Sequence, residues 1–196
     1  AELAIEDAKI DRENIDYIIC AHNYGDVAYG KIQSDTVPSL ASRVKNKLTI
    51  KNPKCVAYDL LFGCPGWNEA MIHANAFIKA GLAMRCLVIG AETLSRVVDE
   101  YDRDSMIYSD GAGAVIVEGG VDNGGILSHE SATYADDELD FLYFGSSYNK
   151  DLPSDVRYIK MLGRKIYEFA LNHVPLAMKS CVDKAGIEIS QIKKIL

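Results

Sequence analysis

Cys64 lies where a buried strand gives way to a helix, a position that can make a thiol reactive. The apolar run from Val56 to Phe62 predicts the strand, Gly63 permits a sharp turn, and Pro65 suits the first position of a helix. Cys64 would then cap a helix whose free N–H groups favour the thiolate over the thiol. Two interpretations stay open on these residues alone: a nucleophile, or a buried structural cysteine of the kind common in protein cores.

The composition is that of an ordinary globular protein. The chain of 196 residues is 48% hydrophobic and 25% charged, which is enough for one sizeable core. A net charge of −7 argues against a general binder of nucleic acid or of an anionic membrane surface. No apolar run is long enough to span a membrane, and the first residues do not resemble a signal peptide.

The cysteines and histidines are scattered rather than grouped. The five cysteines contain no Cys-x-x-Cys pair, and the four histidines form no cluster with metal-ligand spacing. We therefore expect neither a disulfide framework nor a metal site, and a reducing cytoplasm suits the protein best.

Apolar strands alternate with helical segments along the chain. Thr36 is the candidate cap of the second helix, and Pro175 is expected to bend or split the last one. Near-continuous apolar strands separated by helices predict an α/β fold built in layers. The predicted helices are residues 1–9, 37–48, the segment after Cys64 and 158–185; the predicted strands are 15–21, 56–62, 86–92, 112–118 and 125–132; long loops are predicted at 22–35 and 145–157.

One short internal repeat links the two ends of the chain. Both copies read as a helix end, Ala-x-Ile, an acidic loop, and then Ile before an apolar stretch, with Ala8 matching Ala185 and Ile15 matching Ile192. The repeat suggests a duplicated architecture whose second copy stops at the opening of its first strand.

Three segments together resemble the β-ketoacyl-acyl-carrier-protein synthase III family, the initiating condensing enzymes of thiolase fold. Residues 58–67 contain Asp-x-x-x-x-Cys-x-Gly-Trp and are similar to the elbow that carries the nucleophile of the family. Residues 87–103 are similar to the strand and loop after the active-site helix, and residues 108–114 look like the glycine-rich entry to a later strand. The spacing between these segments also fits the family.

The resemblance implies a thiolase-like, layered α-β-α-β-α fold with an internal duplication. Residues 1–150 would form most of the N-terminal half, which carries the nucleophile, and residues 151–196 would begin the C-terminal half, with the fold truncated at both ends. The family's catalytic His and Asn would fall beyond Leu196, so we expect the 196-residue chain alone to be inactive.

The implied reaction has two stages. An acyl-CoA primer is loaded on Cys64, and malonyl-acyl-carrier protein then loses CO₂ and condenses with the acyl group to give a 3-oxoacyl product, which initiates fatty acid biosynthesis. The implied partners are acyl-CoA, acyl carrier protein and a second copy in a homodimer, without cofactor, metal, nucleic acid or membrane. Two alternatives stay open: a related thiolase-fold acyltransferase that makes a quinolone, a resorcinol or hydroxymethylglutaryl-CoA, and a non-catalytic fragment.

Further substrate-binding residues are implied by their positions. Arg103 matches an arginine beside CoA, although it could equally pair with a neighbouring aspartate. Gly163 matches a position that lines the acyl and pantetheine region, or it simply begins a helix. Tyr108 matches an aromatic residue of the acyl pocket wall, and a plain core aromatic would look the same.

Trp67 and Val37 are departures from the family that bear on the choice of primer. Trp67 stands where the family commonly has Phe, and its bulk would reshape the acyl pocket. The loop 22–35 is longer than in typical members, and Val37 aligns where many members place a pocket aromatic donated across the dimer interface. We expect Val37 to line the partner's acyl pocket and to admit a different primer.

Basic residues cluster on one predicted helix and its exit. An acidic carrier protein could dock on them, or they form an ordinary solvated helix face. The cluster consists of Arg43, Lys45, Lys47, Lys51 and Lys54.

Overall fold

A computed structural model describes residues 1–120 and 124–195, and the chain divides into two compact units. Unit 1 comprises Ala1–Val98 and Met106–Asn123, and unit 2 comprises Asp99–Ser105 and Gly124–Leu196. The sequence-based division at residue 150 concerns two halves of a larger fold and stays a prediction.

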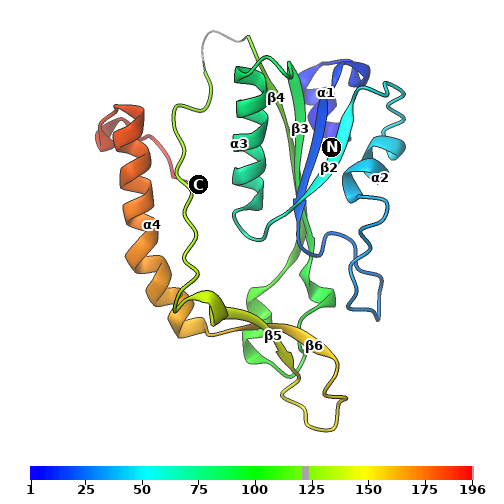
Figure 1. Ribbon diagram of the computed structural model, residues 1–196, viewed down its shortest axis with the longest axis vertical. Coiled ribbons are helices and arrows are strands. Elements are labelled where there is room, and N and C mark those ends of the chain that lie inside the picture. The colour runs from blue at the N-terminus through cyan, green and yellow to red at the C-terminus, as the bar shows by residue number, and fades with distance from the viewer. Residues whose placement is uncertain (121–123, 196) are drawn as a thin grey trace. The chain divides into compact units, whose positions relative to one another are not determined.

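Unit 1 is built on a four-stranded sheet (Figure 1). The order across the sheet is β2-β1-β3-β4, with β1 parallel to both β2 and β3, and β4 antiparallel to β3. The parallel strands therefore end at the same edge of the sheet. The strands are β1 (Tyr17–His22), β2 (Val56–Leu61), β3 (Arg85–Thr93) and β4 (Asp110–Glu118).

Helices cover both faces of this sheet, as the continuous apolar strands predicted. Helices α1 (Glu2–Ala8) and α2 (Leu40–Lys47) pack on one face, where Ile18 and Cys20 of β1 lie in the core. Helix α3 (Gly66–Lys79) packs on the other face, where Ile19 lies. All three of these β1 side chains are 0% exposed, because a central parallel strand is buried on both sides. Truncating either isoleucine to Ala should cost about 2–5 kcal/mol of stability.

Unit 2 contains a β-hairpin and one long helix. Strand β5 (Leu142–Ser146) pairs antiparallel with β6 (Arg157–Met161), and α4 (Gly163–Ala185) follows directly. Helix α4 continues through Pro175 as one element, so the expected split there is not observed. The two units together also contain short 3-10 helices, at Arg12–Asn14, Leu94–Arg96, Arg103–Ile107, Leu139–Phe141 and Ile189–Gln191.

Most elements of unit 1 are confirmed within one to three residues of their predicted ends. The main shift is in the second helix, which begins at Leu40 rather than at residue 37. The prediction that Thr36 caps it is wrong, because the Ser39 hydroxyl accepts the N–H of Ser42 at 3.1 Å and satisfies the helix start there.

The predictions for unit 2 are less accurate. Residues 125–132 form no strand; instead, the Ser128 hydroxyl donates to the Cys181 carbonyl at 2.6 Å and Glu130 accepts from Ser180 at 2.7 Å. These contacts with α4 replace strand pairing. Strands β5 and β6 were not predicted; β5 overlaps the start of the predicted loop 145–157, and β6 replaces the start of the predicted helix 158–185. The two strands form by pairing with each other, which the local sequence of either segment does not reveal. Ile192 likewise lies in no strand among the described residues.

Candidate active site at the strand ends of unit 1

The carboxyl ends of the three parallel strands bring Cys64 and several polar residues to one edge of the sheet. His22 ends β1, the Cys64 turn follows β2, and Glu92 lies at the end of β3. Ligands of α/β proteins commonly bind outside the carboxyl ends of parallel strands. This edge is therefore the candidate active site.

Cys64 lies in a tight turn between β2 and α3. The N–H of Gly66 donates to the carbonyl of Gly63 at 2.7 Å, which closes the turn around Cys64 and Pro65. Helix α3 begins at Gly66 and Pro65 is its cap residue, so the prediction that Cys64 caps the helix is wrong by one residue. Cys64 still lies within two residues of the positive end of a 14-residue helix.

Small residues let the start of α3 lie close against the sheet. A Cβ on Gly66 would lie only 3.1 Å from the Cβ of Ala21, and one on Gly90 would lie 3.3 Å from Cδ1 of Trp67. Trp67 therefore packs over the end of β3 and remains 38% exposed. The elbow position of Cys64 is fixed by these close contacts between helix and strands.

The cysteines differ sharply in their surroundings. Burial, and after it the Asp59 carboxylate, raises the pKa of Cys20 to about 12, and burial likewise raises the pKa of Cys86 to about 12. Burial also raises the pKa of Cys55. Of the five cysteines, all of which the structure describes, Cys64 is the exposed one. Cys64 is therefore not the buried structural cysteine of the alternative interpretation. Its thiol is accessible, as a reactive thiol must be, and its role as nucleophile stays a prediction.

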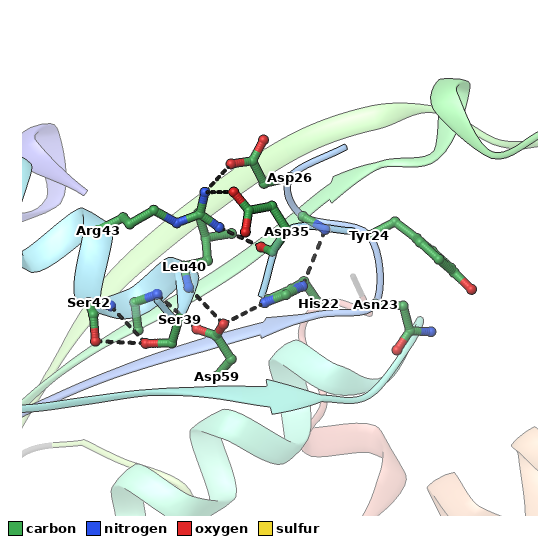
Figure 2. A network of polar contacts seen from close by, with 12 residues as sticks. His22, Asn23, Tyr24, Asp26, Asp35, Ser39, Leu40, Ser42, Arg43 and Asp59 are labelled. Carbon is green, nitrogen blue, oxygen red and sulfur yellow. Dashed lines mark hydrogen bonds and ion pairs between the residues drawn. The ribbon is translucent and has the colours of Figure 1, made fainter. Parts of the chain in front are cut away.

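A buried His–Asp contact supports the elbow strand from the α2 side (Figure 2). Nε2 of His22, which is 2% exposed, lies 3.0 Å from Oδ2 of Asp59. Nδ1 of His22 accepts the N–H of Gly25 at 3.2 Å, so the ring proton belongs on Nε2, which lies beside the carboxylate without forming a hydrogen bond to it. Asp59 also accepts the N–H groups of Leu40 and Ala41 at 2.7 and 2.8 Å, at the positive end of α2.

The start of the loop after β1 is tied to the end of β3. Glu92 accepts the N–H groups of Asn23 and Tyr24 at 2.7 and 2.8 Å. Thr93 returns two hydrogen bonds to the Tyr24 carbonyl, from its N–H at 2.8 Å and its hydroxyl at 2.6 Å. Burial, and then Glu92, raises the pKa of Tyr24 above its ordinary value. The loop therefore leaves the sheet in one defined direction.

The other residues predicted for the site fall in different places. Val37 lies in the loop that leads into α2 and is 85% exposed, and Tyr108 is half-buried directly before β4. In unit 2, the Arg103 side chain is 88% exposed and its Nε lies 3.5 Å from Asp104, which agrees with the alternative of a loop arginine paired with an aspartate. Gly163 begins α4, and a Cβ there would lie 3.3 Å from Oδ2 of Asp104. Their roles toward substrate stay predictions.

Sequence reasoning assigned no role to His22, Asn23, Asp59 or Glu92. Each carried a signal: a polar residue at the end of an apolar strand, or a carboxylate inside one. A carboxylate within a strand needs buried donors, and those donors come from segments far apart in sequence.

The basic cluster is only partly available to a partner. The guanidinium of Arg43 pairs with Asp26 and Asp35, and Nζ of Lys45 donates to the carbonyls of Asn52 and Cys55 at 2.8 and 2.7 Å. The free basic surface therefore consists of Lys47, Lys51 and Lys54, which are exposed.

Metal clusters and membrane-spanning helices are both absent from the part of the chain that the structure describes. Within it, no group of three or more His, Cys, Asp or Glu side chains could hold a metal ion. No helix in residues 1–120 or 124–195 is long and apolar enough to cross a membrane.

Comparison with known proteins supports the resemblance seen in the sequence. Residues 58–135 match the model of the family described as 3-oxoacyl-[acyl-carrier-protein] synthase III. The chain is 36% identical to β-ketoacyl-[acyl-carrier-protein] synthase III 1 of Vibrio vulnificus, with 98% of the chain and 57% of that protein aligned. It is 35% identical to the corresponding synthase of Clostridium acetobutylicum, covering 98% of the chain and 58% of that protein.

Solved structures agree with these relatives. The crystal structure of 3-oxoacyl-[acyl-carrier-protein] synthase III from Aquifex aeolicus matches 98% of the chain and 56% of its own, with a TM-score of 0.79 and 31% identity. The synthase III structure from Thermus thermophilus gives a TM-score of 0.74 at 31% identity, over 92% of the chain and 53% of its own. The chain thus spans somewhat more than half the length of these relatives. Along nearly all of its own length it is similar to β-ketoacyl-acyl-carrier-protein synthase III, and it has their thiolase-type α/β fold.

Proposed function

We propose that the protein acts as a condensing enzyme of the ketoacyl synthase III type, with Cys64 as its nucleophile. The observation that carries the proposal is the exposure of Cys64 at the strand-to-helix elbow inside the matched segment, while the Cys20, Cys55 and Cys86 thiols are buried. The sulfur of Cys64 attacks the thioester carbonyl carbon of an acyl-CoA, a new C–S bond forms, and the CoA thiolate leaves and takes up a proton. Backbone N–H groups at the elbow are suited to stabilise the intermediate oxyanion.

The second stage transfers the acyl group to a malonyl unit carried by acyl carrier protein. Loss of CO₂ generates a carbanion at the malonyl C2, which attacks the acyl carbonyl and releases the Cys64 thiolate. The product is 3-oxoacyl-acyl-carrier protein, which starts a fatty acid chain. The reaction needs no cofactor or metal, and the free cysteines suit the reducing cytoplasm.

An intact-mass measurement tests the nucleophile. The His and Asn implied by the resemblance serve the malonyl step, so the purified protein incubated with acetyl-CoA should still gain one acetyl group, and Cys64→Ser should gain none. Cys181→Ser serves as the matched control, because its sulfur lies against Ser128 in unit 2 and should not affect acetylation. Acetylation that persists in Cys64→Ser, or none in the wild type, would contradict the proposal. Products formed with malonyl thioesters by a protein that also carries the implied His and Asn then separate 3-oxoacyl chains from quinolone, resorcinol or hydroxymethylglutaryl-CoA chemistry.

We propose that acyl carrier protein docks on the exposed lysines at the end of α2. Lys47, Lys51 and Lys54 form a free basic surface that suits an acidic partner. Lys47→Glu combined with Lys51→Glu should raise the KM for malonyl-acyl-carrier protein severalfold and leave acetyl-CoA kinetics unchanged. Lys79→Glu, an exposed change at the end of α3, is the control. An unchanged KM in the double variant would place docking elsewhere.

We also propose a homodimer in which Val37 reaches the partner's acyl pocket. β2 lies at one edge of the described sheet, Leu61 beside the elbow is 72% exposed, and Val37 is 85% exposed. An unpaired strand edge with apolar side chains favours pairing with another chain. Sedimentation should therefore give twice the protomer mass, and Val37→Phe should shift the preferred acyl length toward shorter primers. A monomer, or unchanged selectivity in Val37→Phe, would contradict this arrangement.

A further inference from the structure

The side chain of Asn23 lies on the elbow side of the sheet. Along β1, Ile19 and Ala21 face α3, so that the next residue in the alternation, Asn23, continues the same face beyond the end of the strand. His22 belongs to the opposite face, where it meets Asp59, and Figure 2 shows the His22 and Asn23 side chains pointing in different directions.

Asn23 lies directly against the residue that precedes the nucleophile. A Cβ built on Gly63 would lie 3.0 Å from Nδ2 of Asn23, which is tighter than ordinary van der Waals contact. The missing side chain of Gly63 therefore makes room for the Asn23 carboxamide. The Asn23 carboxamide therefore lies next to the Cys64 turn.

The backbone around Asn23 is held from three sides. Its own N–H donates to Glu92 at 2.7 Å, the ring of His22 before it contacts Asp59, and the carbonyl of Tyr24 after it accepts two hydrogen bonds from Thr93. A residue supported in this way presents its side chain in one position, as binding residues require. Yet no described residue forms a hydrogen bond with the carboxamide itself. The backbone of Asn23 is thus held firmly, while its carboxamide remains free to bind a ligand.

We propose that Asn23 is a specificity-determining residue that hydrogen-bonds an oxygen on the acyl group loaded at Cys64. This inference rests on the proposed acylation of Cys64. A carboxamide offers two donors and one acceptor and carries no charge, so it recognises a hydroxyl or a ketone and gains nothing from a hydrocarbon chain. The preferred primers are therefore acyl thioesters with an oxygen close to the thioester carbonyl, such as 3-hydroxyacyl groups.

The test compares two CoA thioesters of equal chain length. Acylation rates of Cys64 by 3-hydroxybutyryl-CoA and butyryl-CoA are measured by intact mass on the purified protein. We expect the wild type to prefer the hydroxy compound about fivefold, since a neutral hydrogen bond contributes about 1 kcal/mol. Asn23→Leu should remove the preference, so that the two compounds react at equal rates. Asn46→Leu, which places the same side chain at an exposed position of α2, should keep both rates.

A second variant tests the chemistry of the contact. The carboxylate in Asn23→Asp can accept a hydrogen bond from a hydroxyl but cannot donate one to a ketone. Acylation of Cys64 by 3-hydroxybutyryl-CoA should therefore persist in this variant, and acylation by acetoacetyl-CoA should slow severalfold. Melting temperatures of both variants near that of the wild type show that the fold is intact. Acylation of the wild type without any preference, or an unchanged ratio in Asn23→Leu, overturns the role of Asn23 alone. Absence of acylation with every thioester overturns the proposed function as well.

Discussion

The two units use their carboxylates in different ways. In unit 2, Asp99 is 1% exposed and accepts from the Lys160 ammonium, the Ser147 hydroxyl and the N–H groups of Tyr148 and Tyr101. Burial alone would raise the pKa of Asp99, but these hydrogen bonds outweigh it and lower the pKa to about 2. In unit 1, Asp59 and Glu92 accept mainly backbone N–H groups that begin a helix or a loop.

The difference separates a structural cluster from a supporting one. The Lys160 ammonium forms ion pairs with Asp99 and Asp102 and lies 3.9 Å from the centroid of the Tyr148 ring. These contacts all lie inside unit 2. The carboxylates of unit 1 fix the backbone around Asn23 and the Cys64 elbow, and leave an exposed thiol and a carboxamide without partners among the described residues. A buried cluster whose polar groups are all hydrogen-bonded, such as that of Asp99 and Lys160, is typical of a stabilising role. A polar group that is held in place but makes no hydrogen bond to any described residue, such as the Asn23 carboxamide, is typical of a binding role.

The largest expected effect comes from breaking the ion pair of unit 2. Lys160→Met leaves the Asp99 carboxylate buried without its cation, which should lower the free energy of unfolding by about 3–5 kcal/mol. Urea denaturation gives the value, and Lys165→Met, an exposed change on α4, should cost less than about 0.5 kcal/mol. A loss below 1 kcal/mol in Lys160→Met would show that the cluster is not structural.

A smaller loss is expected at the supporting carboxylate of unit 1. Asp59→Ala removes the acceptor of two N–H groups, so the free energy of unfolding should fall by about 2–3 kcal/mol. Acylation of Cys64 should slow as well, because β2 loses its anchor to α2. Asp7→Ala, an exposed change on α1, should alter neither property. Normal acylation in Asp59→Ala would remove Asp59 from the support of the site.

The pH dependence of stability should carry the signature of Asp99. Its folded pKa of about 2 lies below the ordinary value near 3.9, so its contribution is complete above about pH 4 and is lost as the pH falls toward 2. Over this pH range the free energy of unfolding, measured with urea, should fall by about 2 kcal/mol in the wild type. In Asp99→Asn the fall over the same range should be smaller. Hydrogen bonds to Asp99 and Asp102 outweigh burial and raise the pKa of Lys160, so its contribution is lost only as the pH rises above about 10.4. If Asp99→Asn lost as much stability at acid pH as the wild type, this assignment to Asp99 would be contradicted.

The same contrast explains how far the sequence could predict the molecule. The continuous apolar run of β1 and the helical spacing after Cys64 are local patterns, and both elements are confirmed. The hairpin of unit 2 depends on pairing between residues 142–146 and 157–161, which neither segment shows alone. The position of Cys64 at a turn was readable from Gly63 and Pro65. The carboxylates that support it were not, because their donors arrive from other strands and loops.

The smallest expected effect tests the close contact between α3 and the sheet. Gly66→Ala places a Cβ 3.1 Å from that of Ala21, and two rigid elements must separate by a few tenths of an ångström. We expect a loss of about 1 kcal/mol, because overpacking is partly offset by the better helix propensity of Ala. The acylation rate of Cys64 should fall further than this loss implies, since the elbow itself shifts. Gly111→Ala in β4, where a Cβ would meet nothing within 4 Å, is the matched control and should leave acylation unchanged. Equal acylation rates in the two variants would mean that the packing of α3 does not position the thiol.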